Sequence, residues 1–140
     1  MKLILLVALI FMTAASSNQK QPHSGFNVTT FTEAPKDMEG AGESFYLSGK
    51  DKKEGKFICA TNYMTALIYI NQKAIRLETM GEPNSFQSKQ MFTHGKFILI
   101  IVKNHVRKVG DENYTMKGII TLKYNSNVVW MKNVTGEGGD

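Results

Sequence analysis

The sequence predicts an all-β fold, a small antiparallel barrel or sandwich of seven to eight short strands after a mobile N-terminal linker. Three observations predict it. Short runs of β-branched and aromatic residues recur at even spacing after Gly42, turn-forming residues separate them, and no segment keeps a 3.6-residue apolar period. The first 17 residues have a different character.

Residues 1–17 predict a secretory signal peptide. Lys2 supplies a positive charge, the run 3–12 is uncharged, and small residues follow. Cleavage after Ala15 or after Ser17 fits this pattern, and we take Ser17. The apolar run is shorter than the roughly 20 residues of a membrane-spanning helix. Without a cysteine near the cleavage site to carry lipid, we expect a soluble, non-lipidated product in the periplasm or outside the cell, with no transmembrane segment.

The organisation that follows is a signal peptide over 1–17, a linker over 18–38 and a β domain over 39–140. The linker is polar and rich in turn formers. Its apolar residues, which suggest a short first strand or tether, are Phe26, Val28 and Phe31.

Within the β domain, each expected strand is bounded by turn residues. A charged turn is expected at 49–55, and a glycine-rich tail at 136–140. The expected strands cover 45–48, 56–61, 64–70, a partner strand after residue 72, 85–92, 97–108, 115–124 and 128–135.

One hairpin is defined by both its turn and its pattern. Asn71-Gln72 is a plausible two-residue turn. Closing the chain there pairs Ile68 with Ile75 and Ala66 with Leu77 on one face, which is the register that the alternation of apolar residues requires.

Charge and cysteine content exclude several classes of protein. The net charge is +5 and falls to +4 without Lys2, since 17 − 1 = 16 bases then face 12 acids. This mild excess does not indicate nucleic acid binding. Cys59 is the only cysteine, so no intramolecular disulfide is possible, and its strand-like surroundings predict a buried, inert thiol.

No catalytic or metal-binding pattern is present in the sequence. The three histidines, His23, His94 and His105, are far apart, and no nucleophile elbow or phosphate-binding glycine loop occurs. We therefore expect a protein that is not an enzyme and needs no metal or cofactor.

The candidate binding surface is basic. If the loop at 110–112 closes a hairpin, His105 faces Lys117 and Arg107 faces Thr115. The residues expected on this outer face are Lys103, His105, Arg107, Lys117 and Lys123. Such a face suits an unknown protein or an acidic polymer of the cell envelope, although a charged outer face that only prevents aggregation has the same appearance.

An alternative function is carriage of a small apolar ligand inside a barrel. Its candidate lining consists of Met64, Ile68, Ile100, Val102, Met116, Gly118 and Ile120. Small residues such as Gly118 would leave space, but small barrels are usually filled by their own side chains.

Residues 40–48, 54–58 and 69–73, together with the ending 136–140, resemble an uncharacterised family of small exported β-rich proteins of Bacteroidetes-type bacteria. Cysteine pairs at both ends characterise that family, and Ala41, Glu43, Gly138 and Asp140 stand in their places here. Joint loss of both pairs implies that the two segments meet in space. The resemblance implies export and β structure, with no known activity.

The even spacing of short strands is also similar to that in periplasmic inhibitors of c-type lysozyme, which is a likeness of architecture only. That likeness makes inhibition of an envelope-attacking enzyme one specific form of the binding-module hypothesis. The early Gly-x-Trp of lipocalins is absent, because the only tryptophan is Trp130.

Overall fold

The computed structural model describes residues 25–38, 40–82 and 88–139, so the predicted signal peptide lies outside the described residues. Nearly every element is a strand, as predicted. The elements are β1 (Val28–Thr29), the 3₁₀ helix η1 (Lys36–Met38), β2 (Gly42–Tyr46), α1 (Gly49–Lys53), β3 (Cys59–Thr61), β4 (Thr65–Ile70), β5 (Lys73–Thr79), β6 (Lys89–His94), β7 (Phe97–Lys108), β8 (Asn113–Tyr124) and β9 (Asn127–Gly139).

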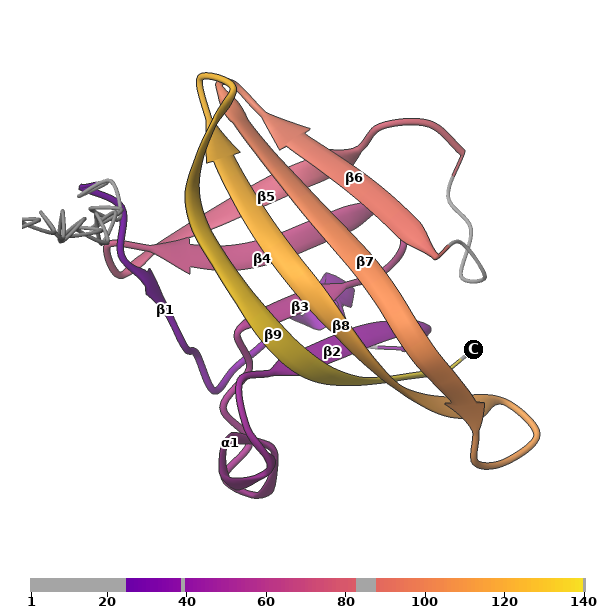
Figure 1. Cartoon of the computed structure of the whole chain (residues 1–140). Coiled ribbons are helices and arrows are strands. Elements are labelled where there is room, and N and C mark those ends of the chain that lie inside the picture. The colour runs from indigo at the N-terminus through magenta and orange to yellow at the C-terminus, as the bar shows by residue number, and fades with distance from the viewer. Residues whose placement is uncertain (1–24, 39, 83–87, 140) are drawn as a thin grey trace, which may run out of the picture.

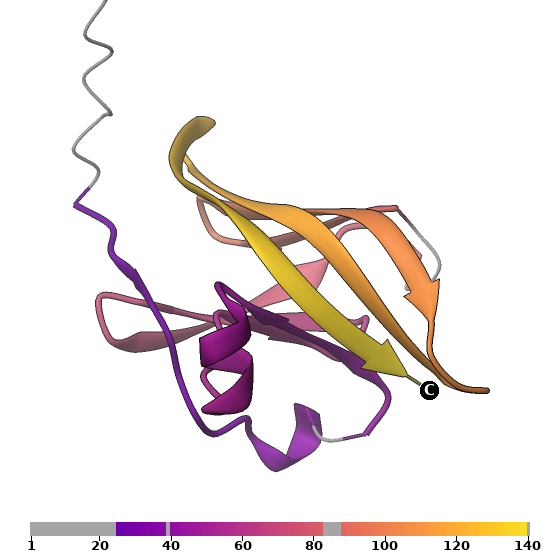
Figure 2. The ribbon, with the colours of Figure 1, turned by 60° about the horizontal axis from the view of Figure 1, so that its bottom comes forward.

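The strands form one antiparallel sheet that closes on itself. Their order is β1-β4-β3-β2-β9-β8-β7-β6-β5, and β4 also pairs with β5. This pairing closes β2–β9 into an eight-stranded barrel and leaves β1 as an extra strand beside β4 (Figure 1). In Figure 2, β9 runs down to the edge of β2, with which it pairs, and α1 and η1 lie on the side of β2 and β3 that faces away from β8.

The hairpin of β4 and β5 confirms the predicted register. Ile68 pairs with Ile75 and Ala66 with Leu77. Asn71 and Gln72 have φ values of 50° and 66°, the left-handed conformation that a two-residue hairpin turn of this kind requires.

The barrel interior is packed with apolar side chains. Fully buried residues include Phe45, Phe92, Leu99, Ile101 and Leu122. Burial of a side chain of this size stabilises the fold by about 1.5–3 kcal/mol. Leu99 and Ile101 alternate with half-buried Ile98 and Ile100, so the odd-numbered residues at the start of β7 face the core.

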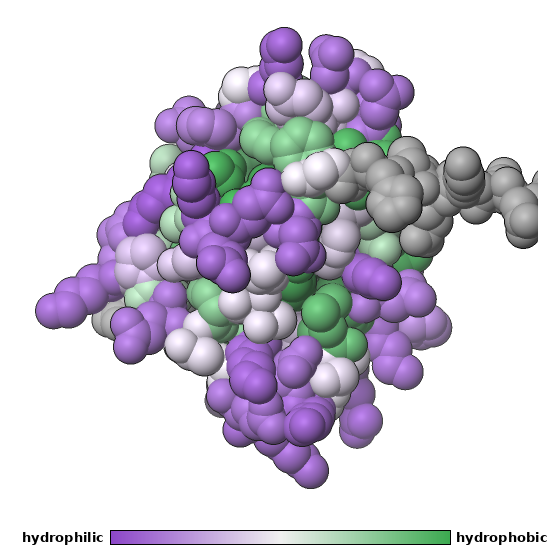
Figure 3. Space-filling model, turned by 90° about the vertical axis from the view of Figure 1, so that its left-hand side faces the viewer, coloured by the Kyte–Doolittle hydropathy of each residue, from purple (hydrophilic) through white to green (hydrophobic). Residues whose placement is uncertain are grey.

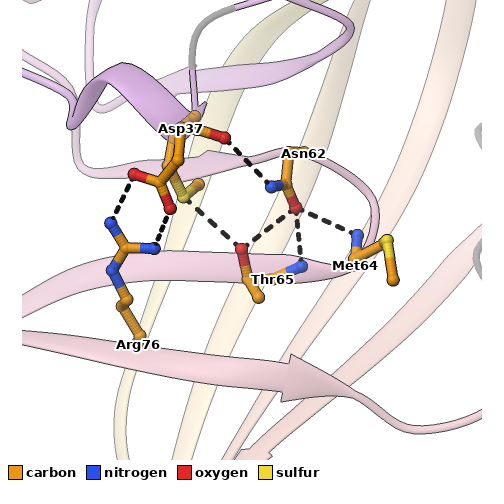
Figure 4. Close-up of polar contacts among 6 residues, drawn as sticks. Asp37, Asn62, Met64, Thr65 and Arg76 are labelled. Carbon is orange, nitrogen blue, oxygen red and sulfur yellow. Dashed lines mark hydrogen bonds and ion pairs between the residues drawn. The ribbon is translucent and has the colours of Figure 1, made fainter.

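Residues 25–38, which we call the strap, pack against the outside of the barrel. Phe31 and Met38 join Ala60 and Leu67 in a second apolar cluster. Beyond this cluster, the Asp37 carboxylate of η1 accepts two hydrogen bonds from the Arg76 guanidinium of β5 (Figure 4). These bonds lower the pKa of Asp37. The packed domain therefore includes residues 25–38, and the short strand expected near Phe26–Phe31 is present as β1.

The turn between β3 and β4 is fixed to the same region. Asn62 Oδ1 accepts hydrogen bonds from the backbone N–H groups of Met64 and Thr65, at 3.1 and 2.7 Å (Figure 4). Asn62 Nδ2 also donates to the Asp37 carbonyl. The strap is thus anchored at η1 by both β5 and the β3–β4 turn.

Two expectations about local structure were wrong or incomplete. The expected turn at 49–55 contains the helix α1, whose N-terminus is capped by Ser48 Oγ accepting from the Asp51 N–H at 3.1 Å. The expected tail is part of β9, which runs to Gly139 and pairs with β2. Glu43 lies opposite Gly138, so the segments around these two residues meet in space, as predicted.

Candidate functional site

The hairpin of β7 and β8 projects from the barrel, and we call residues 104–113 the hairpin arm. All of them are exposed. Both ribbon views show the arm extending past the barrel end (Figures 1 and 2). Its side chains include three basic residues, His105, Arg107 and Lys108, and two valines, Val106 and Val109, that are 58% and 57% exposed. Basic and apolar groups that face solvent together are typical of a contact surface.

A β-bulge forms the base of the arm. The register of β7 and β8 shifts between Asn104 and Arg107, and His105 has a φ of 50°. Asn104 therefore faces Lys117, so the predicted pairing of His105 with Lys117 is wrong. Beyond the bulge the register is shifted by one residue, and the predicted pairing of Arg107 with Thr115 is confirmed. Bulges of this kind redirect side chains and occur next to functional sites.

The bulge nevertheless brings His105 and Lys117 together. Both line a surface hollow of about 270 Å³ beside Asn104 and Asn133, and Thr135 completes its polar wall. Leu47 and Ile119 supply apolar lining. Within the part of the chain that the structure describes, no ion pair engages His105, Arg107 or Lys117. The hollow thus offers the Lys117 ammonium, the His105 imidazole and the amides of Asn104 and Asn133 to an acidic ligand.

The other two candidate residues lie elsewhere. Lys123 is six residues from Lys117 on the same strand, opposite Ile98, which at about 3.3 Å per residue is about 20 Å away. Lys103 was expected on the outer face, and this prediction is wrong. Its side chain is buried inside the barrel because it continues the core-facing alternation of Leu99 and Ile101.

Lys103 belongs to a group that we call the polar end cluster, Glu43, Tyr63, Lys103 and Tyr114. Lys103 Nζ lies 2.9 and 2.8 Å from the two carboxylate oxygens of Glu43, and both side chains are at most 2% exposed. A buried charge is tolerated only when it is paired and hydrogen-bonded. The cluster meets this requirement at the barrel end near the arm.

Two tyrosines connect this ion pair to the surface. The Tyr114 hydroxyl donates to Glu43 Oε2 at 3.0 Å and lies 3.0 Å from the Tyr63 hydroxyl, which donates to the Gly139 carbonyl at 3.3 Å. Burial and the hydrogen bond to Tyr63 raise the pKa of Tyr114. Tyr63 has a φ of 69°, an uncommon conformation for a bulky residue. The two hydroxyls thus form a hydrogen-bonded chain that leads from the Glu43 carboxylate to Tyr63.

Glycine makes room for this cluster. Gly138 lies between Tyr114 and Glu43 in the sheet. A Cβ atom on Gly138 would lie 2.6 Å from Tyr114 Cζ and 3.0 Å from Glu43 Cγ. Gly136, whose Cβ would meet Phe45 and Met116, and Gly138 thus serve as small inward-facing positions of β9.

Cys59 is buried in the core, as predicted. Burial raises the pKa of its thiol, and the nearby Glu43 carboxylate acts in the same direction. A thiol that stays protonated is a poor nucleophile and metal ligand.

The seven residues expected to line an apolar pocket do not all face the barrel interior. Ile68, Met116, Gly118 and Ile120 are buried. Met64 is 61% exposed. Ile100 and Val102 lie on the outer face of β7, so these three do not line a common interior with the others.

Comparison with protein-family models, curated proteins and solved structures finds no match to the chain. Among the described residues, no group of three or more histidine, cysteine, aspartate or glutamate side chains is arranged to hold a metal ion. The helices of the described segments are all too short or too polar to cross a membrane.

Proposed function

We propose that the chain is an exported, non-enzymatic binding module, and that the hairpin arm with the adjoining hollow is its contact surface. The observation that carries the proposal is the joint presence of His105 and Lys117 in one hollow, with Arg107 beside it on the projecting arm. The resemblance to a family of small exported proteins supports the location of this activity in the periplasm or outside the cell.

The partner is a protein or polymer that presents carboxylates. Lys117 and Arg107 carry positive charges that can bind an anion directly. The exposed Val106 and Val109 add apolar area next to these charges. The combination of charged and apolar contact area favours an acidic protein surface as the partner, because an acidic polymer offers little apolar surface for the valines to contact.

An enzyme that attacks the cell envelope is one specific partner of this kind. Glycoside hydrolases carry a pair of carboxyl groups in their substrate cleft, and a projecting cationic hairpin has complementary charge. The test is a titration of the mature chain against a panel of c-type and other lysozymes, which follows the lytic rate and complex formation by size-exclusion chromatography.

Three variants make the test specific for the arm. Arg107→Ala and Lys117→Ala should each weaken binding at least about tenfold, because a hydrogen bond to a charged group contributes about 1.5–3 kcal/mol. Lys123→Ala is the matched control, because it removes the same charge about 20 Å from Lys117. A complex that tolerates all three substitutions equally would show that another surface makes the contact.

If no lysozyme is inhibited, the same variants serve in affinity capture from an envelope fraction. A protein retained by the wild-type chain and by Lys123→Ala, but lost with Arg107→Ala, would be the partner that the proposal requires. Equal retention by all variants would contradict the proposal.

A further inference from the structure

The outer face of strands β6 to β9 is mostly apolar. These four strands lie side by side (Figure 1), and their pairing places the outward-facing side chains in three rows across the sheet. Of the twelve side chains in these rows, seven are large and apolar and none is acidic. The twelve residues, which we call the sheet face, are the middle row Met91, Ile100, Thr121 and Met131, and the outer rows Lys89, Val102, Ile119 and Asn133, and Thr93, Ile98, Lys123 and Val128.

β7, the second strand of the sheet face, is apolar on both of its sides. Leu99 and Ile101 are fully buried in the barrel. Ile98, Ile100 and Val102 lie on the opposite side of the strand and are only half-buried. Strands that are apolar on both sides are typical of sheets that are covered on both faces. The sequence of β7 therefore suits a sheet whose outer face also meets an apolar partner.

The sheet face is open to solvent in the described chain. Met131 is 59% exposed and Val128 is 44% exposed. The apolar cluster of the strap covers β3 and β4 instead. On the neighbouring side of the barrel, which carries β1, hydrophilic residues divide the apolar surface into small areas (Figure 3). A continuous apolar area with polar residues around it is typical of a contact site.

The positive charge of the chain is concentrated in the same strands. Residues 88–139 contain eight lysines and arginines and three aspartates and glutamates, so they carry a net charge of 8 − 3 = +5, which equals that of the whole chain. On the sheet face, Lys89 and Lys123 stand in the two outer rows, on either side of the middle row. A complementary partner is therefore apolar opposite the middle row and anionic beside it.

The size of the sheet face argues against a stable protein partner. Three strand spacings of about 4.8 Å and two steps of about 6.7 Å along the strands give about 14 by 13 Å between the outermost Cα atoms. Adding about 5 Å at each edge for side chains gives about 550 Å², less than the roughly 800 Å² that each partner contributes to a stable protein interface. A second copy would also place lysines against lysines.

The chemistry of the middle row argues in the same direction. Thr121 is its only polar side chain, whereas protein interfaces hold about one hydrogen bond per 100–200 Å². A lipid surface requires no such bonds at the centre of the contact, and a fluid bilayer can follow the convex wall of a barrel. Its anionic headgroups supply the negative charge that Lys89 and Lys123 require.

We propose that the sheet face binds reversibly to the surface of an anionic phospholipid membrane. The apolar side chains of the middle row enter the boundary between headgroups and acyl chains. Lys89 and Lys123 reach the lipid phosphates, because a lysine stem lies along apolar surface while its ammonium stays in polar surroundings. The proposal goes beyond the proposed function and does not use the hairpin arm. A soluble polyanion offers no apolar phase to the middle row, so we do not expect it to bind here.

The test is co-sedimentation of the full mature chain with lipid vesicles. Vesicles of phosphatidylcholine with about one third phosphatidylglycerol should bind the chain at least tenfold more strongly than vesicles of phosphatidylcholine alone, because each lysine near an anionic surface strengthens binding about fivefold. Raising the salt concentration should reduce this preference, since salt screens exposed charges.

Two variants of the sheet face have matched controls. Met131→Ser should reduce the partition coefficient about tenfold, because it removes a large apolar side chain from the contact. Met64→Ser should bind like the wild type, since Met64 is 61% exposed but lies in the turn between β3 and β4. Lys123→Ala should reduce the partition coefficient about fivefold, whereas Lys53→Ala, which removes the same charge from α1, should leave it unchanged.

Several results would overturn the proposal. One is the absence of binding to the anionic vesicles, and another is equal binding to both kinds of vesicle. A loss in Met131→Ser no larger than that in Met64→Ser would place the lipid contact on another surface. A wild-type dimer that grows with concentration and is lost in Met131→Ser would assign the sheet face to a second copy instead of a membrane.

Discussion

Replacing Lys103 by methionine tests how the polar end cluster is held in the barrel. The substitution keeps the length of the side chain but leaves the Glu43 carboxylate buried without its ammonium partner. Of the hydrogen bonds to this carboxylate described above, the one from the Tyr114 hydroxyl then remains. Breaking a buried pair from one side costs about 3–5 kcal/mol, because an uncompensated charge remains in the interior.

The magnitude can be read in a thermal melt followed by circular dichroism. At about 4 °C per kcal/mol for a domain of this size, Lys103→Met should lower the melting temperature by about 12–20 °C. The double variant Glu43→Leu/Lys103→Met removes both charges and should recover most of this loss, since an apolar replacement of a buried pair is often neutral. Lys50→Met is the control, because Lys50 pairs with Glu54 at the surface with a side chain that is 81% exposed, and it should change stability by less than about 0.5 kcal/mol.

The reasoning would be refuted if the double variant were as unstable as the sum of the two single variants. That result would mean that Glu43 and Lys103 stabilise the barrel independently, each through its own packing, and that their 2.8 Å contact contributes no coupling energy.

Three further predictions concern residues of β9, β2 and β3. Gly138→Ala should destabilise the fold by about 1–3 kcal/mol through overpacking, whereas Gly110→Ala, which meets no atom closer than 3.9 Å, should be nearly neutral in the same urea titration. Burial and the hydrogen bond to Glu137 raise the pKa of Tyr46 to about 12. Since this folded-state pKa lies above the unfolded value near 10, the stabilisation is complete below pH 10 and is lost as the pH rises to about 12, and Tyr46→Phe should flatten that decline in stability. The buried Cys59 thiol should react with a thiol reagent only at the rate of unfolding, and rapid labelling of the native chain would contradict its burial.

Much of the fold could be predicted because alternation and turn chemistry act locally. The β4–β5 register follows from Asn71-Gln72 and the alternating apolar residues, and it is the register observed. The bounds expected for the strand at 97–108 are those of β7. Barrel closure was beyond these signals, because the pairing of β2 with β9 joins residues almost a hundred positions apart.

The prediction of the site was less accurate than that of the fold, because two features of the site depend on non-local effects. A strict two-residue alternation cannot show the bulge at His105, which shifts the partner of Lys117 by one residue. The same alternation places Lys103 with Leu99 and Ile101, but a lysine suggests solvent unless its partner is known, and Glu43 lies 60 residues away. The signals for the buried pair were the unbroken apolar run before Lys103 and the spaced glycines of β9.

The helix α1 was missed for a different reason. Its five residues are too few to show a helical period, and lysines dominate them. Ser48 followed three residues later by Asp51 is a helix-start signal that could have indicated it.

The central claim is that the hairpin arm and its hollow bind acidic groups. The most direct measurement is an amide correlation spectrum of the ¹⁵N-labelled chain titrated with a short poly-L-glutamate. The claim predicts saturable shifts confined to residues 104–108, Lys117 and Asn133, with no change at Lys123. Shifts spread evenly over all surface lysines, or centred on Lys123, would contradict it.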